Sequence, residues 1–183
     1  MLFRSKSKPA KGSNKSSETP ASVPAGAAAP GTAPPQVQVQ IVGQYIKDMS
    51  FENPNIKNLL SGPGENPNMK IEINVNAQRV GDDAFESAID FRAHATNDAG
   101  SIYVLDVLYA GLFRIKGIPE QSLEPFLLIN CPTILFPYLR RLVADVSREG
   151  GFPPLLIDPI DFAGLFMQRQ QQLMAEAAAA PKN

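Results

Sequence analysis

The sequence predicts an α+β fold in which a four-stranded antiparallel sheet is followed by two C-terminal helices on one face. Two observations support this prediction. Apolar and polar residues alternate with a period of two in four segments between residues 37 and 116, whereas beyond residue 119 apolar residues recur at spacings of three and four. The turns between the second, third and fourth segments are short, so these strands should form an antiparallel meander.

The first strand is predicted over residues 37–52, with polar Gln38, Gln40, Gln44, Asp48, Ser50 and Glu52 on one face. Its predicted apolar face is formed by Val37, Val39, Ile41, Tyr45, Met49 and Phe51. A loop rich in Pro, Gly and Asn separates it from a second strand over 69–78, and a turn at 81–83 leads to a third over 85–96.

The fourth strand, 101–116, is apolar on both faces. One face carries Tyr103, Leu105, Val107, Tyr109, Phe113 and Ile115, and the other carries Ile102, Val104, Leu108 and Leu112 together with Asp106. Both faces should therefore be shielded from water. One of them can be covered by the chain's own helices or by a second copy of the chain. The remaining apolar face is typical of a partner site.

The first helix should begin near Pro132 or earlier and end at Gly150, and Pro137 should either bend it or reset its start. The connection after it, residues 152–159, is more apolar than ordinary surface loops. Asp158 or Asp161 should cap a second helix. One stripe of this second helix carries Phe162, Leu165, Phe166, Arg169 and Leu173, all apolar except Arg169.

Composition divides the chain into three parts. Residues 1–36 are rich in Pro, Ala, Ser and Lys and should form a disordered basic arm, residues 37–174 the folded domain, and residues 175–183 a flexible Ala-rich tail. The arm carries a net charge of +4, so with a net charge of −1 for the whole chain the rest carries −5. An acidic folded domain argues against nucleic acid as the main ligand.

The residues offer little for catalysis. His94 is the sole histidine and Cys131 the sole cysteine, which excludes a disulfide within the chain and metal sites built from several histidines or several cysteines. No glycine-rich phosphate loop is present. We expect no cofactor, and an enzyme is the weakest class of hypothesis. Residues 1–15 are basic but no apolar run follows, so a soluble, cytoplasmic protein without membrane insertion is expected.

Four segments resemble the SecB family of protein-export chaperones. They are YIKDMSFENPN at 45–55, CPTILFPY at 131–138, VSREGGFPPL at 146–155 and DFAGLFM at 161–167, which stand in the family's order. The resemblance implies a homotetramer arranged as a dimer of dimers, with Leu105, Val107 and Tyr109 supporting assembly. It also implies an ATP-independent chaperone that holds unfolded precursor proteins.

The resemblance further implies a partner, the motor protein SecA, docking through a basic tail. The matching positions here are Asp48, Glu52, Val104 and Asp106, where Val104 and Asp106 stand in place of the family's frequent leucine and glutamate. From the residues alone, a merely solvated sheet face is the alternative for these four positions.

Unfolded clients are expected in apolar grooves formed by Phe152, Leu155, Leu156, Ile157, Phe162, Leu165 and Phe166. For each of these side chains, ordinary core packing is the alternative. A structural oligomerisation module without clients is the second functional hypothesis, and an unrecognised enzyme the third. The sequence leaves open whether such a chaperone serves export alone or also another system, such as control of a toxin.

Overall fold

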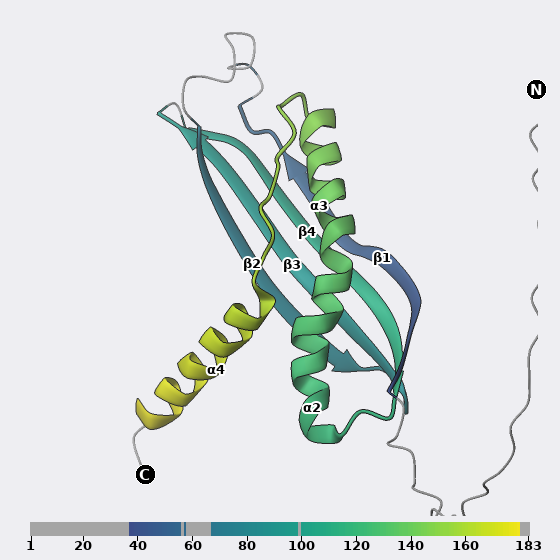
Figure 1. Ribbon diagram of the computed structural model, residues 1–183. Coiled ribbons are helices and arrows are strands. Elements are labelled where there is room, and N and C mark those ends of the chain that lie inside the picture. Colours follow the sequence, from purple (N-terminus) through teal and green to yellow (C-terminus); the bar gives the residue numbers. More distant parts are fainter. Residues whose placement is uncertain (1–36, 56, 58–66, 99, 180–183) are drawn as a thin grey trace, which may run out of the picture. The chain divides into compact units, whose positions relative to one another are not determined.

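The computed structural model describes residues 37–55, 57, 67–98 and 100–179. Four strands come first and helical segments follow, which confirms the predicted α+β fold (Figure 1). The strands are β1 (Gln38–Glu52), β2 (Asn68–Arg79), β3 (Ala84–Asn97) and β4 (Gly100–Lys116). The helical segments are α2 (Glu120–Pro125), the π-helix η1 (Phe126–Asn130), α3 (Cys131–Glu149) and α4 (Phe162–Ala179).

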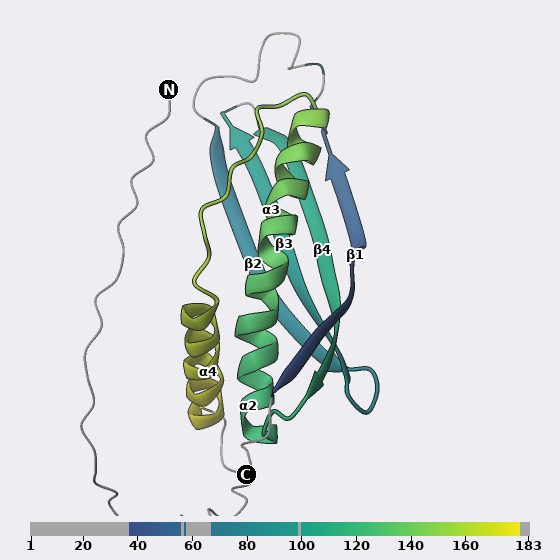
Figure 2. The same cartoon turned by 45° about the vertical axis from the view of Figure 1, so that its right-hand side comes forward.

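The sheet has the order β1-β4-β3-β2, and every neighbouring pair is antiparallel. The predicted meander of β2, β3 and β4 is confirmed, while β1 pairs with β4 at the far edge. Helix α3 lies across one face of the sheet and α4 lies beside β2, as both views show (Figures 1 and 2). The face that α3 covers is called the inner face below, and the opposite one the outer face.

Strand β1 departs from the predicted alternation because two irregularities interrupt its register with β4, between Ile41 and Gly43 and between Ile46 and Asp48. Each extra residue reverses the direction of the side chains that follow. Tyr45 therefore pairs with Ala110 and lies on the outer face, so its predicted place on the apolar face with Phe51 is wrong.

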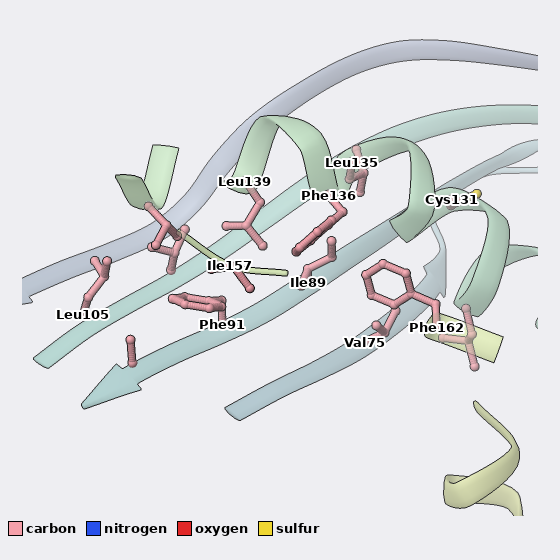
Figure 3. Close-up of a cluster of buried hydrophobic side chains, with 14 of the residues drawn as sticks. Val75, Ile89, Phe91, Leu105, Cys131, Leu135, Phe136, Leu139, Ile157 and Phe162 are labelled. Atoms are coloured by element: carbon pink, nitrogen blue, oxygen red, sulfur yellow. The ribbon is translucent and has the colours of Figure 1, made fainter. Parts of the chain in front are cut away.

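The core lies between the inner face and α3. Phe91, Leu105, Val107 and Phe113 from the sheet are buried together with Leu135, Leu139 and Val143 from α3. Figure 3 shows Phe136 and Leu139 projecting from the helix toward Ile89 and Phe91. Gly111 makes this approach possible, since a Cβ there would lie 2.6 Å from Leu135 Cδ2. One of the two apolar faces of β4 is thus covered by the chain's own helix.

Helical structure runs without a break from α2 through η1 to α3. The Cys131 N–H donates to the carbonyl of Phe126, five residues back, immediately before Pro132, which has no N–H to give. Pro137 lies inside α3, so of the two alternatives left by the sequence it does not reset the start of the helix. By length and composition this run is the one helix of the described chain that could cross a membrane, since an 18-residue window in it has a mean hydropathy of 1.3. Its buried stripe, however, packs on the sheet.

Helix α4 begins as predicted, because Asp161 Oδ1 accepts a hydrogen bond from the Gly164 N–H at 2.9 Å, as a helix cap does. It continues to Ala179, five residues into the predicted flexible tail, in agreement with the high helix propensity of alanine. The predicted disordered arm, residues 1–36, and the end of the tail, 180–183, lie outside the described residues.

Candidate functional site

The apolar loop after α3 starts from a tightly defined turn. Gly151 has φ +88°, its N–H donates to the Arg148 carbonyl at 3.0 Å, and the Phe152 N–H donates to the Ser147 carbonyl at 3.1 Å. This pair of bonds is the Schellman arrangement, which requires a residue that tolerates the left-handed conformation. The glycine pair therefore ends the helix and also directs the loop back over the sheet.

Two further contacts hold the loop. The buried Ser147 Oγ accepts a hydrogen bond from the Leu155 N–H at 2.8 Å. The ring of Phe152 lies 4.8 Å from that of Tyr103 and 6.2 Å from that of Phe51, measured between centroids. The first part of the loop is thus fixed to α3 by a hydrogen bond and to β1 and β4 by aromatic contacts.

The seven predicted client-binding residues fall into two groups. Phe152, Ile157 and Phe162 are buried in the core, so for these three the alternative of core packing holds. Leu156 is 73% exposed, and the remaining three are partly buried at the edge of the core. Those three are Leu155, Leu165 and Phe166.

Leu165 and Phe166 line a cavity of about 570 Å³ between α4 and β2. Its other apolar lining comes from Ile73, Val75, Leu128, Phe162 and Leu173, and polar residues such as Asn74, Gln168 and Gln172 also line it. Sequence reasoning did not include the β2 residues, because the period-two pattern does not reveal which strand lies beside α4. Arg169 crosses the gap and donates from Nη1 to the Val75 carbonyl at 2.9 Å.

The four positions predicted for SecA binding come together on the outer face. Glu52 pairs directly with Val104 and Asp48 with Leu108, while Ser50 between them pairs with Asp106. Paired residues of antiparallel strands project to the same face. The second irregularity in β1 precedes Asp48 and leaves this part of the register intact.

The three acids of this outer-face site differ in their surroundings. Asp106 accepts two hydrogen bonds from Arg92 of β3, at 2.6 Å from Nε and 3.2 Å from Nη2. Among the described residues, neither Asp48 nor Glu52 forms a salt bridge with a lysine or arginine. A cationic ligand would therefore meet two unneutralised carboxylates and one that is already paired.

Nearer the other end of the outer face, Glu86 is the most buried carboxylate of the described chain. It accepts hydrogen bonds from Tyr45, from Lys47 Nζ at 2.6 Å and from Gln78 Nε2 at 2.9 Å. Burial raises the pKa of Glu86, but these donors together hold it below its ordinary value, while the bond to Glu86 raises the pKa of Tyr45 to about 12. The cluster ties β1 to β3 and β2 across β4.

The residues predicted to support assembly lie on the inner face. Leu105 and Val107 have essentially no accessible surface within one chain, so they cannot be direct contacts between chains and could affect assembly only by positioning α3. Tyr109 is half-buried. The exposed apolar side chains include several on β1 and one on α3, among them Val39, Ile41, Ile46, Met49 and Tyr138.

The reactive residue types show no arrangement for catalysis in the described part of the chain. Burial raises the pKa of the Cys131 thiol to about 12, and the His94 ring pairs with Ser101 Oγ at 2.9 Å. Among the described residues, no three His, Cys, Asp or Glu side chains are grouped to hold a metal ion.

Comparison with known proteins gives a consistent result. Residues 32–173 match the family model described as Preprotein translocase subunit SecB. The chain is 46% identical over 158 residues to the protein-export protein SecB of Parvibaculum lavamentivorans, covering 86% of this chain and 92% of that protein. The corresponding protein of Xanthobacter autotrophicus is 47% identical over 134 residues, covering 73% and 86%.

Among solved structures, the fold is similar to that of a SecB-like chaperone from Mycobacterium tuberculosis in complex with a ChAD peptide from an antitoxin. The TM-score is 0.55 at 19% sequence identity, and the match covers 67% of this chain and 90% of that one. At this identity the likeness concerns the fold.

Proposed function

This chain belongs to the SecB family of protein-export chaperones, and from that premise we propose that it is an ATP-independent cytoplasmic holdase that binds unfolded precursor proteins and delivers them to SecA. The observation that carries the proposal is the apolar loop after α3, which presents an exposed Leu156 and leads into α4, whose Leu165 and Phe166 line the cavity beside β2. No nucleotide is needed, because holding is an equilibrium between client and chaperone.

The proposed client site has surface of the required kind. Leu155, Leu156, Leu165 and Phe166 keep accessible apolar area, while the buried anchors Phe152, Ile157 and Phe162 hold them in place. Burying apolar surface contributes about 25 cal/mol per Å² before the cost of ordering the client, and it discriminates little between sequences. Low selectivity suits a protein that must accept many precursors.

The test is suppression of aggregation of a refolding precursor, followed by light scattering without ATP. Leu155→Ser with Leu156→Ser should weaken suppression at least about tenfold, because burying one leucine side chain is worth roughly 1.5–3 kcal/mol and each 1.4 kcal/mol is a factor of about ten in affinity. Val80→Ser removes a side chain that is 50% exposed in the turn after β2, away from the loop, and serves as the matched control. Unchanged suppression by the double variant, with its assembly intact, would show that clients bind elsewhere.

We also propose that the outer-face site of Asp48, Glu52, Val104 and Asp106 binds SecA. The unneutralised carboxylates of Asp48 and Glu52, with the half-buried Val104 beside them, suit a cationic segment with an apolar anchor. Asp48→Ala with Glu52→Ala should abolish SecA binding in calorimetry and leave client holding unchanged. Glu124→Ala with Glu149→Ala makes the same change in charge on the helical run, so equal losses from both pairs would refute the site.

Assembly as a dimer of dimers completes the proposal. The exposed apolar side chains of β1 and Tyr138 of α3 offer a surface that a second copy could cover, and symmetric self-association is the common way to do so. Light scattering after size exclusion should give the mass of a tetramer. A tetramer that suppresses no aggregation would favour the second hypothesis, an oligomerisation module without clients.

A further inference from the structure

The ion pair between Arg92 and Asp106 stands inside the site proposed for SecA. Arg92 belongs to β3. In the strand register it lies opposite Asp106 of β4 on one side and opposite Glu72 of β2 on the other. Both of its hydrogen bonds go to Asp106, so the guanidinium engages both carboxylate oxygens. A bidentate pair of this kind is stronger and more directional than a single contact.

The pair borders a surface hollow of about 250 Å³, which Asp48, Ser50, Asp90 and Leu108 also line. Arg92 is thus the cation that directly engages a carboxylate of this site. Two other cations of the sheet are engaged elsewhere: Lys70 of β2 pairs with Glu72 at 2.7 Å, and Lys47 of β1 pairs with Glu86 at 2.6 Å.

We propose that Arg92 is an internal competitor at the SecA site, which occupies Asp106 in the free protein and yields that carboxylate when a cationic segment binds. The inference rests on the proposed function of the outer-face site. Arg92 sets a threshold: a single lysine offers only a point charge against a bidentate guanidinium, so a ligand must engage Asp48 and Glu52 as well to displace it. The contact would select for segments with several clustered cations.

The test compares variants of the full chain by calorimetric titration with purified SecA. Arg92→Gln should bind about two- to fivefold more tightly, the range expected when an exposed ion pair no longer has to be broken. Arg92→Lys keeps the net charge but loses the two-pronged guanidinium contact with Asp106. It should increase the affinity for SecA less than Arg92→Gln does, and because the charge is unchanged this increase cannot come from the net charge of the face. Lys70→Gln removes one positive charge without touching Asp106 and should change the affinity less than Arg92→Gln.

Asp106→Asn, alone and combined with Arg92→Gln, completes a double-mutant cycle. If Arg92 acts by masking Asp106, Arg92→Gln in the Asp106→Asn background should gain no more than Lys70→Gln gains in that background. A gain that survives the loss of Asp106, or equal gains from Arg92→Gln and Lys70→Gln in the wild-type background, would overturn the proposal. Arg92 is more than half exposed, so these variants should fold.

A second ligand separates this inference from the proposed partner. The same variants are titrated with a synthetic peptide that contains several clustered lysines. If wild-type protein does not bind SecA but Arg92→Gln exceeds Lys70→Gln with the peptide, the partner is wrong and the masking stands. If SecA binds and the two variants gain equally with both ligands, the partner stands and the masking is wrong.

Discussion

Ser147→Ala should release the apolar loop without unfolding the domain. The Ser147 Oγ is buried, donates to the Ala144 carbonyl at 3.1 Å and accepts from the Leu155 N–H at 2.8 Å. Alanine removes the acceptor and leaves the partly buried Leu155 N–H without a partner. Such an unsatisfied donor costs roughly 1–3 kcal/mol, and the higher helix propensity of alanine offsets at most about 0.5 kcal/mol of this.

The net cost, about 0.5–3 kcal/mol, should fall on the closed position of the loop, because the Leu155 N–H can reach water if the loop moves. Amide hydrogen exchange should therefore become about 2- to 150-fold faster at Leu155. Thr133→Ala is the control: it removes a hydroxyl that bonds the Ile129 carbonyl at 2.6 Å and has no partner in the loop. Unchanged exchange at Leu155, or equally faster exchange throughout α3, would refute the reasoning.

Two further predictions concern stability and are measured by urea denaturation. Gly150→Ala should lower the free energy of unfolding by about 1–3 kcal/mol, because its Cβ would lie 2.3 Å from Phe51 Cζ and overpacking displaces neighbours. Gly43→Ala is the control: no atom lies within 4 Å of its new Cβ, so it should not show this loss. Glu86 has a lowered pKa, so its carboxylate stabilises the fold above its unfolded pKa, and that contribution disappears as pH falls through the lower folded value. Glu86→Gln should therefore be less stable than wild type at pH 6, and the difference should shrink toward pH 3; a difference independent of pH would contradict this assignment.

The order of the elements follows from periodicity, but the register of β1 does not. Alternation reports that a segment is a strand, and a β-bulge is an insertion of one residue that depends on the partner strand. In β1 the polar Gln44 and the amphipathic Tyr45 fit either face, so their chemistry did not signal the reversal. The hydrogen bond from Tyr45 to Glu86 comes from distant parts of the sequence and appears only in the folded chain.

The outer-face site was predictable in its positions but not in its charge. The resemblance of the first-strand motif, together with the matching fourth-strand positions, indicated Asp48, Glu52, Val104 and Asp106. Nothing in either segment shows that Asp106 is neutralised, because its partner Arg92 lies on β3 and becomes a neighbour only through the pairing of β3 with β4. Counting acids in the sequence therefore overestimates the free negative charge of this face.

The apolar loop shows why core packing and client binding were hard to separate from the sequence. Both uses require the same residue types, and in the structure buried and exposed apolar side chains of the loop lie within a few residues of each other. Phe152 and Ile157 are buried on either side of the exposed Leu156, so two anchors hold the segment between them against the sheet. A leucine held out in this way is costly for a protein that has nothing to cover it, because exposed apolar surface favours non-specific association. The two anchors let the chain keep that surface in a fixed place, where a client segment can cover it without the domain having to unfold.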